Sequence, residues 1–113
     1  MTEVYVALGA AVGAPLRYVA GHLLDGDHRT LPWGTIGVNV VGSFLLGLFT
    51  GLALAGSTIA LLGTGFCGAL TTFSAFAVQT HDRGPRLGAW NVLITVLPSI
   101  ALCALGFWVG AQA

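Results

Sequence analysis

Polar side chains recur at helical spacing inside stretches of the chain that carry no charged residue. Asn39 and Ser43 are four residues apart, and Asn91, Thr95 and Ser99 repeat every four residues. Residues four apart share one face of an α-helix, so the second set forms a stripe of hydroxyl and amide groups. Such groups can donate hydrogen bonds to an anion. For any single Ser or Thr, a hydrogen bond between helices or back to its own helix is the simpler interpretation.

The segment 63–76, Gly-Thr-Gly-Phe-Cys-Gly-Ala-Leu-Thr-Thr-Phe-Ser-Ala-Phe, is too rich in glycine and threonine for an uninterrupted helix. It predicts a helix break, and a break within a membrane is tolerated where the freed backbone groups line a cavity or bind an ion. Phe73 and Phe76 follow this break. Their spacing alone fits packing or contact with lipid, but the positive edges of two rings beside a narrow path would also attract an anion.

The composition places these residues in a membrane. Hydrophobic residues make up 56% of the chain and charged residues only 7%, against roughly 25% charged in soluble domains. With about 20 residues per crossing, the sequence predicts an all-α integral membrane protein with four transmembrane helices, the third of them broken. We expect spans at residues 4–24, 33–54, 58–80 and 88–111, joined by loops at 25–32, 55–57 and 81–87.

Four spans use nearly all of residues 1–113, which are expected to form a single transmembrane domain with no room for a soluble catalytic or nucleic-acid-binding domain. The first residues lack the basic segment of a secretory signal, so the first span is expected to be retained. Three pairs of glycines one helical turn apart would let helix backbones approach closely, within one subunit or at a subunit interface. The pairs are Gly9 and Gly13, Gly47 and Gly51, and Gly106 and Gly110.

The predicted spans contain no Asp, Glu or Lys, and Arg17 is their only charged residue. Proton-coupled transport needs a titratable group within the membrane, so passive conduction is the simpler prediction. Arg17 lies about two turns from the first loop, close enough for its charged head to reach the interface. It either anchors that end of the helix or attracts anions into a vestibule.

The other reactive side chains do not indicate an enzyme. Cys67 and Cys103 fall inside apolar runs, which predicts buried free thiols. His22 and His81 lie at the ends of spans without a partner at metal-ligand spacing. The sequence contains no nucleophile–base pair and no phosphate-binding loop. Its net charge is zero and it has no lysine, which argues against nucleic acid as a partner.

Arginine gives an indication of orientation in the membrane. Arg29, Arg83 and Arg86 lie in the first and third loops, whereas the termini and the middle loop carry no Lys or Arg. This bias favours both termini outside the cell. The bias is small, so it does not exclude insertion of the chain in both orientations. An antiparallel homodimer requires such dual insertion.

Three segments resemble the fluoride channel family known as Fluc or CrcB. They are Gly-Ala-Pro-Leu-Arg-Tyr at 13–18, Gly-Thr-Ile-Gly-Val-Asn-Val-Val-Gly-Ser-Phe at 34–44, and residues 65–76 of the break segment. The resemblance covers all four spans. It implies a fluoride-selective channel that exports fluoride passively through the lipid bilayer of a prokaryotic plasma membrane. It also implies an antiparallel dimer with two pores and a structural sodium ion on the dimer axis.

Mapped onto this chain, the resemblance implies a set of site residues. The sodium ion would bind the backbone carbonyls of Gly68 and Thr71. The fluoride pore would be lined by Phe73, Phe76, Ser74, Asn39, Asn91, Thr95 and Ser99. Pro98 departs from the family pattern, where glycine is common, and Gln79 stands where many members carry glutamate. Gln79 and a short third loop leave two alternatives for the dimer partner, which are a second copy of this chain and a paired homologous subunit.

Two other classes of protein fit the count of four spans. A small multidrug-resistance exporter also pairs antiparallel, but it relies on a glutamate within its first span, and the nearest glutamate here is Glu3, outside the bilayer. A structural membrane subunit would explain the glycine pairs. It would leave the polar stripes and the run 71–76 unexplained.

Overall fold

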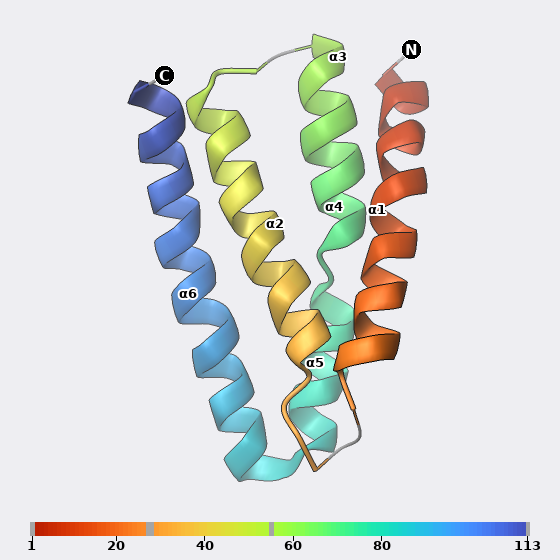
Figure 1. The fold of residues 1–113 in the computed structure, drawn as a ribbon, viewed down its shortest axis with the longest axis vertical. Helices are drawn as coiled ribbons and strands as arrows, with labels where there is room; N and C mark the ends of the chain where they lie inside the picture. The colour runs from red at the N-terminus through yellow and green to blue at the C-terminus, as the bar shows by residue number, and fades with distance from the viewer. Residues whose placement is uncertain (1, 27–28, 55, 113) are drawn as a thin grey trace.

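The computed structural model describes residues 2–26, 29–54 and 56–112, and these residues form only helices and the turns between them. Four helical stretches are long and apolar enough to cross a membrane: Thr2–Leu24, Trp33–Gly51, Gly56–Asp82 and Gly84–Gln112. The four predicted spans are therefore confirmed in number and order. The two ends of the chain lie at the same end of the bundle (Figure 1).

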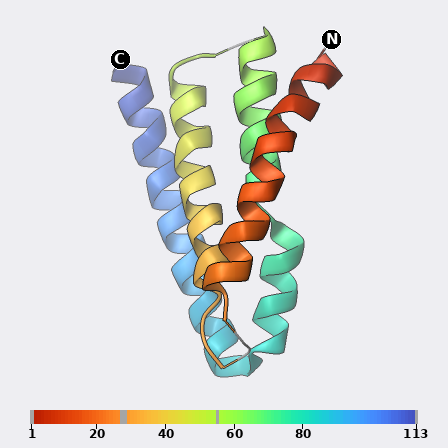
Figure 2. The ribbon, with the colours of Figure 1, turned by 45° about the vertical axis from the view of Figure 1, so that its right-hand side comes forward.

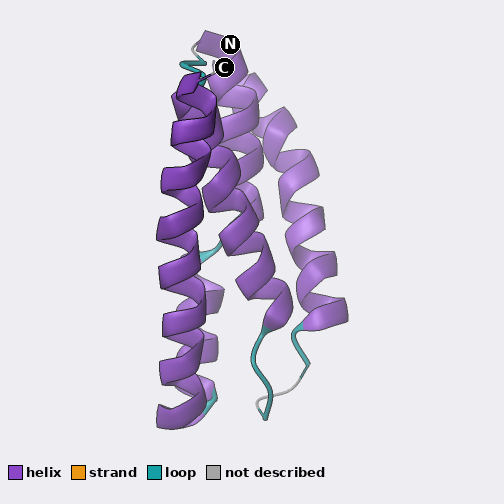
Figure 3. Cartoon of the chain, turned by 60° about the vertical axis from the view of Figure 1, so that its left-hand side comes forward, coloured by secondary structure: helices purple, strands orange, loops and turns teal. Residues whose placement is uncertain are grey.

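The third span consists of four consecutive elements. In chain order the helices are α1 (Thr2–Leu24), α2 (Trp33–Gly51), α3 (Gly56–Ile59), the π-helical η1 (Ala60–Cys67), α4 (Gly68–Leu70), α5 (Phe73–Asp82) and α6 (Gly84–Gln112). Thr71 and Thr72 have extended backbone conformations, with ψ angles of 159° and 126°, and separate α4 from α5. The loop segment in the middle of this span is visible in Figure 3. The predicted break is confirmed, whereas the π-helical turns before it were not predicted.

The predicted end of the second span at residue 54 is wrong, because α2 stops at Gly51. The backbone N–H groups of Leu52 and Ala53 bond the carbonyls of Leu48 and Thr50, which closes the last turn. Ala53 then takes a positive φ of 58°, in the left-handed region that commonly ends a helix. Of the predicted middle loop, residue 55 lies outside the described residues.

The predicted third loop at 81–87 is also wrong, because most of it is helical. Helix α5 continues to Asp82 and α6 begins at Gly84, where a φ of 80° reverses the chain. Pro85 suits the first turn of α6, where a backbone N–H is not needed. The first loop is found as predicted at residues 25–26 and 29–32, and residues 27–28 lie outside the described part of the chain.

The helices pack as two close pairs, α1 with η1 and α4, and α2 with α6 (Figures 1 and 2). The predicted glycine pairs lie at these contacts. A Cβ at Gly9 or Gly13 would meet the third-span backbone at Phe66, and one at Gly47 would meet the backbone of Cys103 on α6. From the other side, Gly106 faces the backbone of α2. Each pair therefore serves packing within the subunit, the first of the two interpretations.

Large apolar side chains cover the outside of the bundle. Leu23, Ile100 and Trp108 are each more than half exposed, at 71%, 64% and 61%. Soluble monomers seldom expose continuous apolar surfaces, so these faces require lipid or another subunit against them. The membrane setting predicted from composition therefore agrees with the packed structure.

The glycine contacts lead to a matched prediction on α2. Replacing Gly47 with Ala would force the Cβ into the backbone of Cys103, whereas no atom of the described residues lies within 4 Å of a Cβ at Gly37. Overpacking of this kind destabilises by roughly 1–3 kcal/mol. We expect Gly47→Ala to lower the unfolding midpoint in detergent and Gly37→Ala to leave it nearly unchanged. Equal midpoints for the two variants would contradict the packing described here.

Candidate functional site

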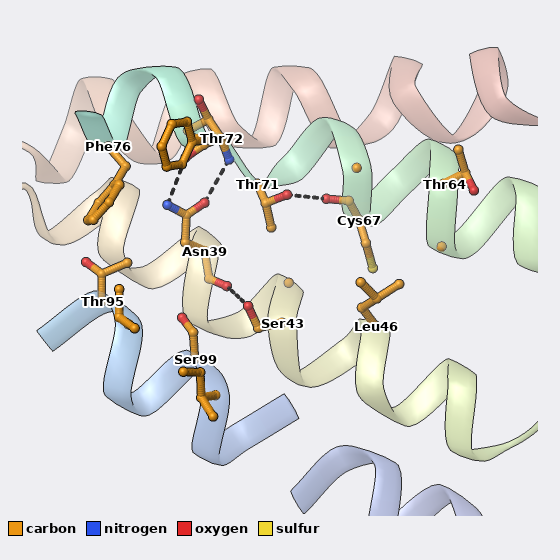
Figure 4. Close-up of a pocket in the computed structure, with 16 residues that line it drawn as sticks. Asn39, Ser43, Leu46, Thr64, Cys67, Thr71, Thr72, Phe76, Thr95 and Ser99 are labelled. Atoms are coloured by element: carbon orange, nitrogen blue, oxygen red, sulfur yellow. Dashed lines mark hydrogen bonds between the residues drawn. The ribbon is translucent and has the colours of Figure 1, made fainter. Parts of the chain in front are cut away.

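A cavity of about 620 Å³ lies where α2, the broken third span and α6 meet (Figure 4). Seven of the predicted site residues line it. They are Asn39, Gly68, Thr71, Phe73, Phe76, Thr95 and Ser99. Its wall contains no Asp, Glu, Lys or Arg among the described residues that line it. The structure therefore brings residues from three spans to one largely apolar space with a few polar groups.

The extended residues of the break are held by the side-chain amide of Asn39. Its Oδ1 accepts a hydrogen bond from the backbone N–H of Thr72 at 2.8 Å, and its Nδ2 donates to the carbonyl of Thr72 at 3.0 Å. This two-bond pairing replaces the partners that a continuous helix would supply. An amide nitrogen carries two hydrogens, so Asn39, which lines the cavity, has one N–H that the bond to Thr72 does not use.

Helix α5 begins immediately after this pair, with Thr72 as its N-cap. The Thr72 hydroxyl accepts a hydrogen bond from the backbone N–H of Ala75 at 3.2 Å, which satisfies one of the free donors of the first turn. Predicted pore residue Ser74 is exposed, its hydroxyl is 3.3 Å from that of Thr72, and it does not line the cavity. The cap fixes where the helix carrying Phe73 and Phe76 starts.

Three side chains bind backbone carbonyls at the break, and one of them is the Thr71 hydroxyl, which donates to the carbonyl of Cys67 at 3.0 Å. Arg17 donates from Nε to the carbonyl of Ala69 at 3.1 Å, and Asn39 donates from Nδ2 to the carbonyl of Thr72. Among the described residues, the carbonyls of Gly68 and Thr71 receive no side-chain donor that competes for them. Arg17 is thus tied to the end of α4, where a positive charge is favourable.

These carbonyls fit the cation that the family resemblance implies. Gly68 and Thr71 both line the cavity, and carbonyl dipoles suit a hard cation such as sodium. No group of three His, Cys, Asp or Glu side chains that could hold a transition metal occurs among the described residues. Backbone carbonyl oxygens, which suit a hard cation, are the donors that Gly68 and Thr71 offer.

The polar stripe on α6 divides into a buried part and a part that faces the cavity. Asn91 is fully buried, donates from Nδ2 to the Thr80 hydroxyl at 2.8 Å, and accepts from the Thr95 hydroxyl at 3.3 Å. The Ser99 hydroxyl is buried and has no hydrogen-bond partner among the described residues. Thr95 and Ser99 line the cavity, whereas Asn91 lies behind it and ties α6 to α5.

The two phenylalanines lie together on one wall. Their ring centroids are 6.0 Å apart and the rings are tilted by 49°. Phe73 is 78% exposed in the isolated subunit even though it lines the cavity. This wall of the cavity is therefore exposed on one side at the surface of the isolated subunit.

The sequence comparisons agree with the geometry. A model of the family described as CrcB-like protein, Camphor Resistance (CrcB), matches residues 4–111. The chain belongs to this family. A CrcB relative in Rhodococcus jostii (strain RHA1), named Fluoride-specific ion channel FluC 2, is 44% identical over 110 residues, which cover 97% of this chain and 96% of that protein. Fluoride-specific ion channel FluC 1 of Frankia casuarinae is 42% identical over 120 residues, covering 94% and 93%.

Some residues of this CrcB-like site were not predicted as site residues. Thr72 could have been found, since a threonine directly before an apolar helix is an N-cap signal. Thr64 and Cys67 also line the cavity. Both cysteines are free thiols as predicted, but only Cys67 is buried. The prediction of burial is wrong for Cys103, which is half-buried beside Gly47 of α2.

The pairing of Asn39 with the break leads to a stability prediction. Replacing Asn39 with Leu removes both partners of Thr72, and each unpaired buried backbone group costs about 1–3 kcal/mol. We expect Asn39→Leu to lower the free energy of unfolding by at least about 2 kcal/mol. The control is Ser43→Ala, which changes another cavity residue whose hydroxyl only bonds its own helix at the carbonyl of Asn39. Similar losses in a detergent unfolding assay would mean that Asn39 does not hold the break.

Proposed function

We propose that this chain is the subunit of a fluoride-selective channel that lets fluoride leave the cell passively and so lowers cytoplasmic fluoride. The observation that supports this most is the convergence of the phenylalanine pair, the Asn39 amide and the unpartnered Ser99 hydroxyl on one cavity. The relatives that match over nearly the whole chain are named as fluoride-specific ion channels.

The wall of this cavity offers an anion hydrogen-bond donors and ring edges in place of water. Fluoride is small and strongly hydrated, so it enters only where donors such as the Asn39 N–H and the Ser99 hydroxyl replace its hydration shell. The positive edges of Phe73 and Phe76 add weak attraction. Asn91 contributes to this wall indirectly, because it accepts a hydrogen bond from the hydroxyl of Thr95. Ser74 extends the hydroxyl surface beside Phe73.

The lining also supports passive conduction. The described residues that form the cavity include no carboxylate and no histidine, so none of them offers a proton-binding group of the kind that coupled transporters use within the membrane. Arg17 is the charged residue nearest to the break, and its Nε is bonded to Ala69. The driving force would then be the fluoride gradient alone.

The working channel would be an antiparallel dimer of two such single-domain, four-helix subunits. The exposed Phe73 and the absence of any buried residue in α5, all of which the structure describes, support a second subunit against this face. The partner is a second copy of the chain or a paired homologous subunit. A structural sodium ion would be bound between subunits by the carbonyls of Gly68 and Thr71, where it would stabilise the dimer.

The function is tested by ion efflux from liposomes that contain only this purified chain. We expect fluoride efflux, followed with a fluoride electrode, and no comparable chloride efflux, because narrow hydrogen-bonding walls replace the shell of a small ion and exclude a larger one. Protein-free liposomes are the control. Equal fluxes of the two ions would overturn the proposal, and fluoride efflux from this chain alone would identify its partner as a second copy.

The pore assignment is tested by replacing Phe73 with Ile. Isoleucine keeps the residue apolar, so insertion and dimer formation should survive, but it lacks the ring edge that faces the anion. Each 1.4 kcal/mol added to the barrier lowers flux about tenfold, and we expect fluoride efflux to fall by at least about tenfold. The matched control is Phe107→Ile, since Phe107 is also an exposed phenylalanine, at 50%, and does not line this cavity.

Size-exclusion chromatography on the same preparations separates conduction from folding. If Phe73 is only a packing residue, the Phe73→Ile variant should lose the dimer first and conduct normally whenever the dimer forms. A well-folded Phe73→Ile dimer with wild-type fluoride efflux would remove Phe73 from the pore.

A further inference from the structure

The carboxylate of Asp25, in the first loop, makes three hydrogen bonds that connect separate parts of the fold. Its Oδ1 accepts from the backbone N–H of Thr35 at 2.8 Å, and its Oδ2 accepts from the Thr35 hydroxyl at 2.8 Å. Oδ2 also accepts from the Nε2 of Gln79 on α5 at 3.0 Å. Asp25 thus joins the start of α2 to the helix that carries the two phenylalanines.

Asp25 caps the N-terminus of α2, although it lies in the preceding loop and not at the cap position. The residue at the cap position is Pro32, which makes no side-chain cap hydrogen bond. Thr35 lies in the first turn, where backbone N–H groups lack helical partners and a negative charge is favourable. These bonds orient the carboxylate and leave its Oδ2 directed at Gln79.

The surroundings of the carboxylate are shaped to hold it. A Cβ at Gly21 would lie 3.1 Å from Oδ2, and one at Gly34 would lie 3.0 Å from Oδ1, so both glycines leave the space that Asp25 fills. Arg83, one turn beyond Gln79, donates from Nε to the carbonyl of Thr30 at 2.6 Å and from Nη2 to the carbonyl of Asp25 at 3.4 Å. Side chain and backbone of Asp25 are both fixed.

Polar contacts help to position helix α5 in the subunit, together with the close approach of Gly88 on α6 to the backbone of Thr80. None of its residues, all of them described, is buried. Its beginning is fixed by the pair of Asn39 and Thr72, and its second half by the bond from Asn91 to Thr80. Gln79 is three residues beyond Phe76 and supplies a further contact.

We propose that Asp25 is a positioning residue for conduction, acting through Gln79 to set the rotation of α5 and hence of Phe73 and Phe76. The pairing requires a hydrogen-bond donor at residue 79, because a glutamate there would bring a second carboxylate to about 3 Å from the first. This inference rests on the proposed fluoride channel and adds a residue outside the cavity to it.

The test is a double-mutant cycle on fluoride efflux with Asp25→Asn, Gln79→Glu and both changes together. Gln79→Glu places two carboxylates together, so this single change should lower efflux per folded dimer about tenfold. In Asp25→Asn the new amide can donate to the Oε1 of Gln79, which has no partner among the described residues, so efflux should stay within about threefold of the wild type. In the double variant the amide introduced at position 25 donates to the carboxylate introduced at position 79, which restores the hydrogen bond with the two groups exchanged. Efflux should then recover to within about threefold of the wild type.

The matched control is Asp82→Asn, which removes a carboxylate from the exposed end of the same helix. It should leave efflux within about twofold of the wild type. A double variant that conducts no better than Gln79→Glu, or a Gln79→Glu variant that conducts normally, would overturn the positioning role. So would losses that follow only the amount of folded dimer on size exclusion, since that result describes a purely structural contact.

The cycle also separates this inference from the proposed function. If the wild-type chain releases fluoride and the losses are additive, the positioning role fails alone. If the wild-type chain releases no fluoride, either alone or together with a paired homologous subunit, both fail.

Discussion

In hydrocarbon, every backbone polar group needs a partner inside the protein, and this requirement shapes the third span. The chain leaves helical geometry at Thr71 and Thr72, where a continuous helix would have paired these groups. The side chain of Asn39 hydrogen bonds both the N–H and the carbonyl of Thr72, and Arg17 donates to the carbonyl of Ala69. What remains at the break is a small set of backbone carbonyls, those of Gly68 and Thr71, in residues that line the cavity.

Rigid packing elsewhere supports this local irregularity. The pairs of α1 with the first half of the third span, and of α2 with α6, are close because glycines on each helix meet backbone on the other. Asn39 is therefore carried by a helix that is fixed against α6, and Asn91 by α6 itself. Helix α5 has one such contact, where Gly88 of α6 faces the backbone of Thr80. None of its own residues is buried, so polar contacts at Thr72, Gln79 and Thr80 also contribute to where its phenylalanines lie.

Features that depend on nearby residues could be predicted from the sequence. The four spans follow from runs of apolar residues, the break from the glycine and threonine content of 63–76, and the glycine contacts from spacing. Features that depend on distant partners could not. Asp25 looks like an ordinary residue of a polar loop, and its role appears only with Thr35 and Gln79, which are 10 and 54 residues away. The same holds for Asn91, whose partner Thr80 removes it from the cavity wall.

The hydrogen bonds already made within the subunit separate residues that hold the site from residues that can meet an ion. Along α6, Asn91 uses its amide on Thr80, Thr95 bonds Asn91, and Ser99 has no partner among the described residues. Ser99 is therefore the member of the stripe whose hydroxyl is not used within the described part of the subunit. Polarity along the stripe thus changes from structural support near the α5–α6 turn to unused hydrogen-bonding capacity in a residue of the cavity wall.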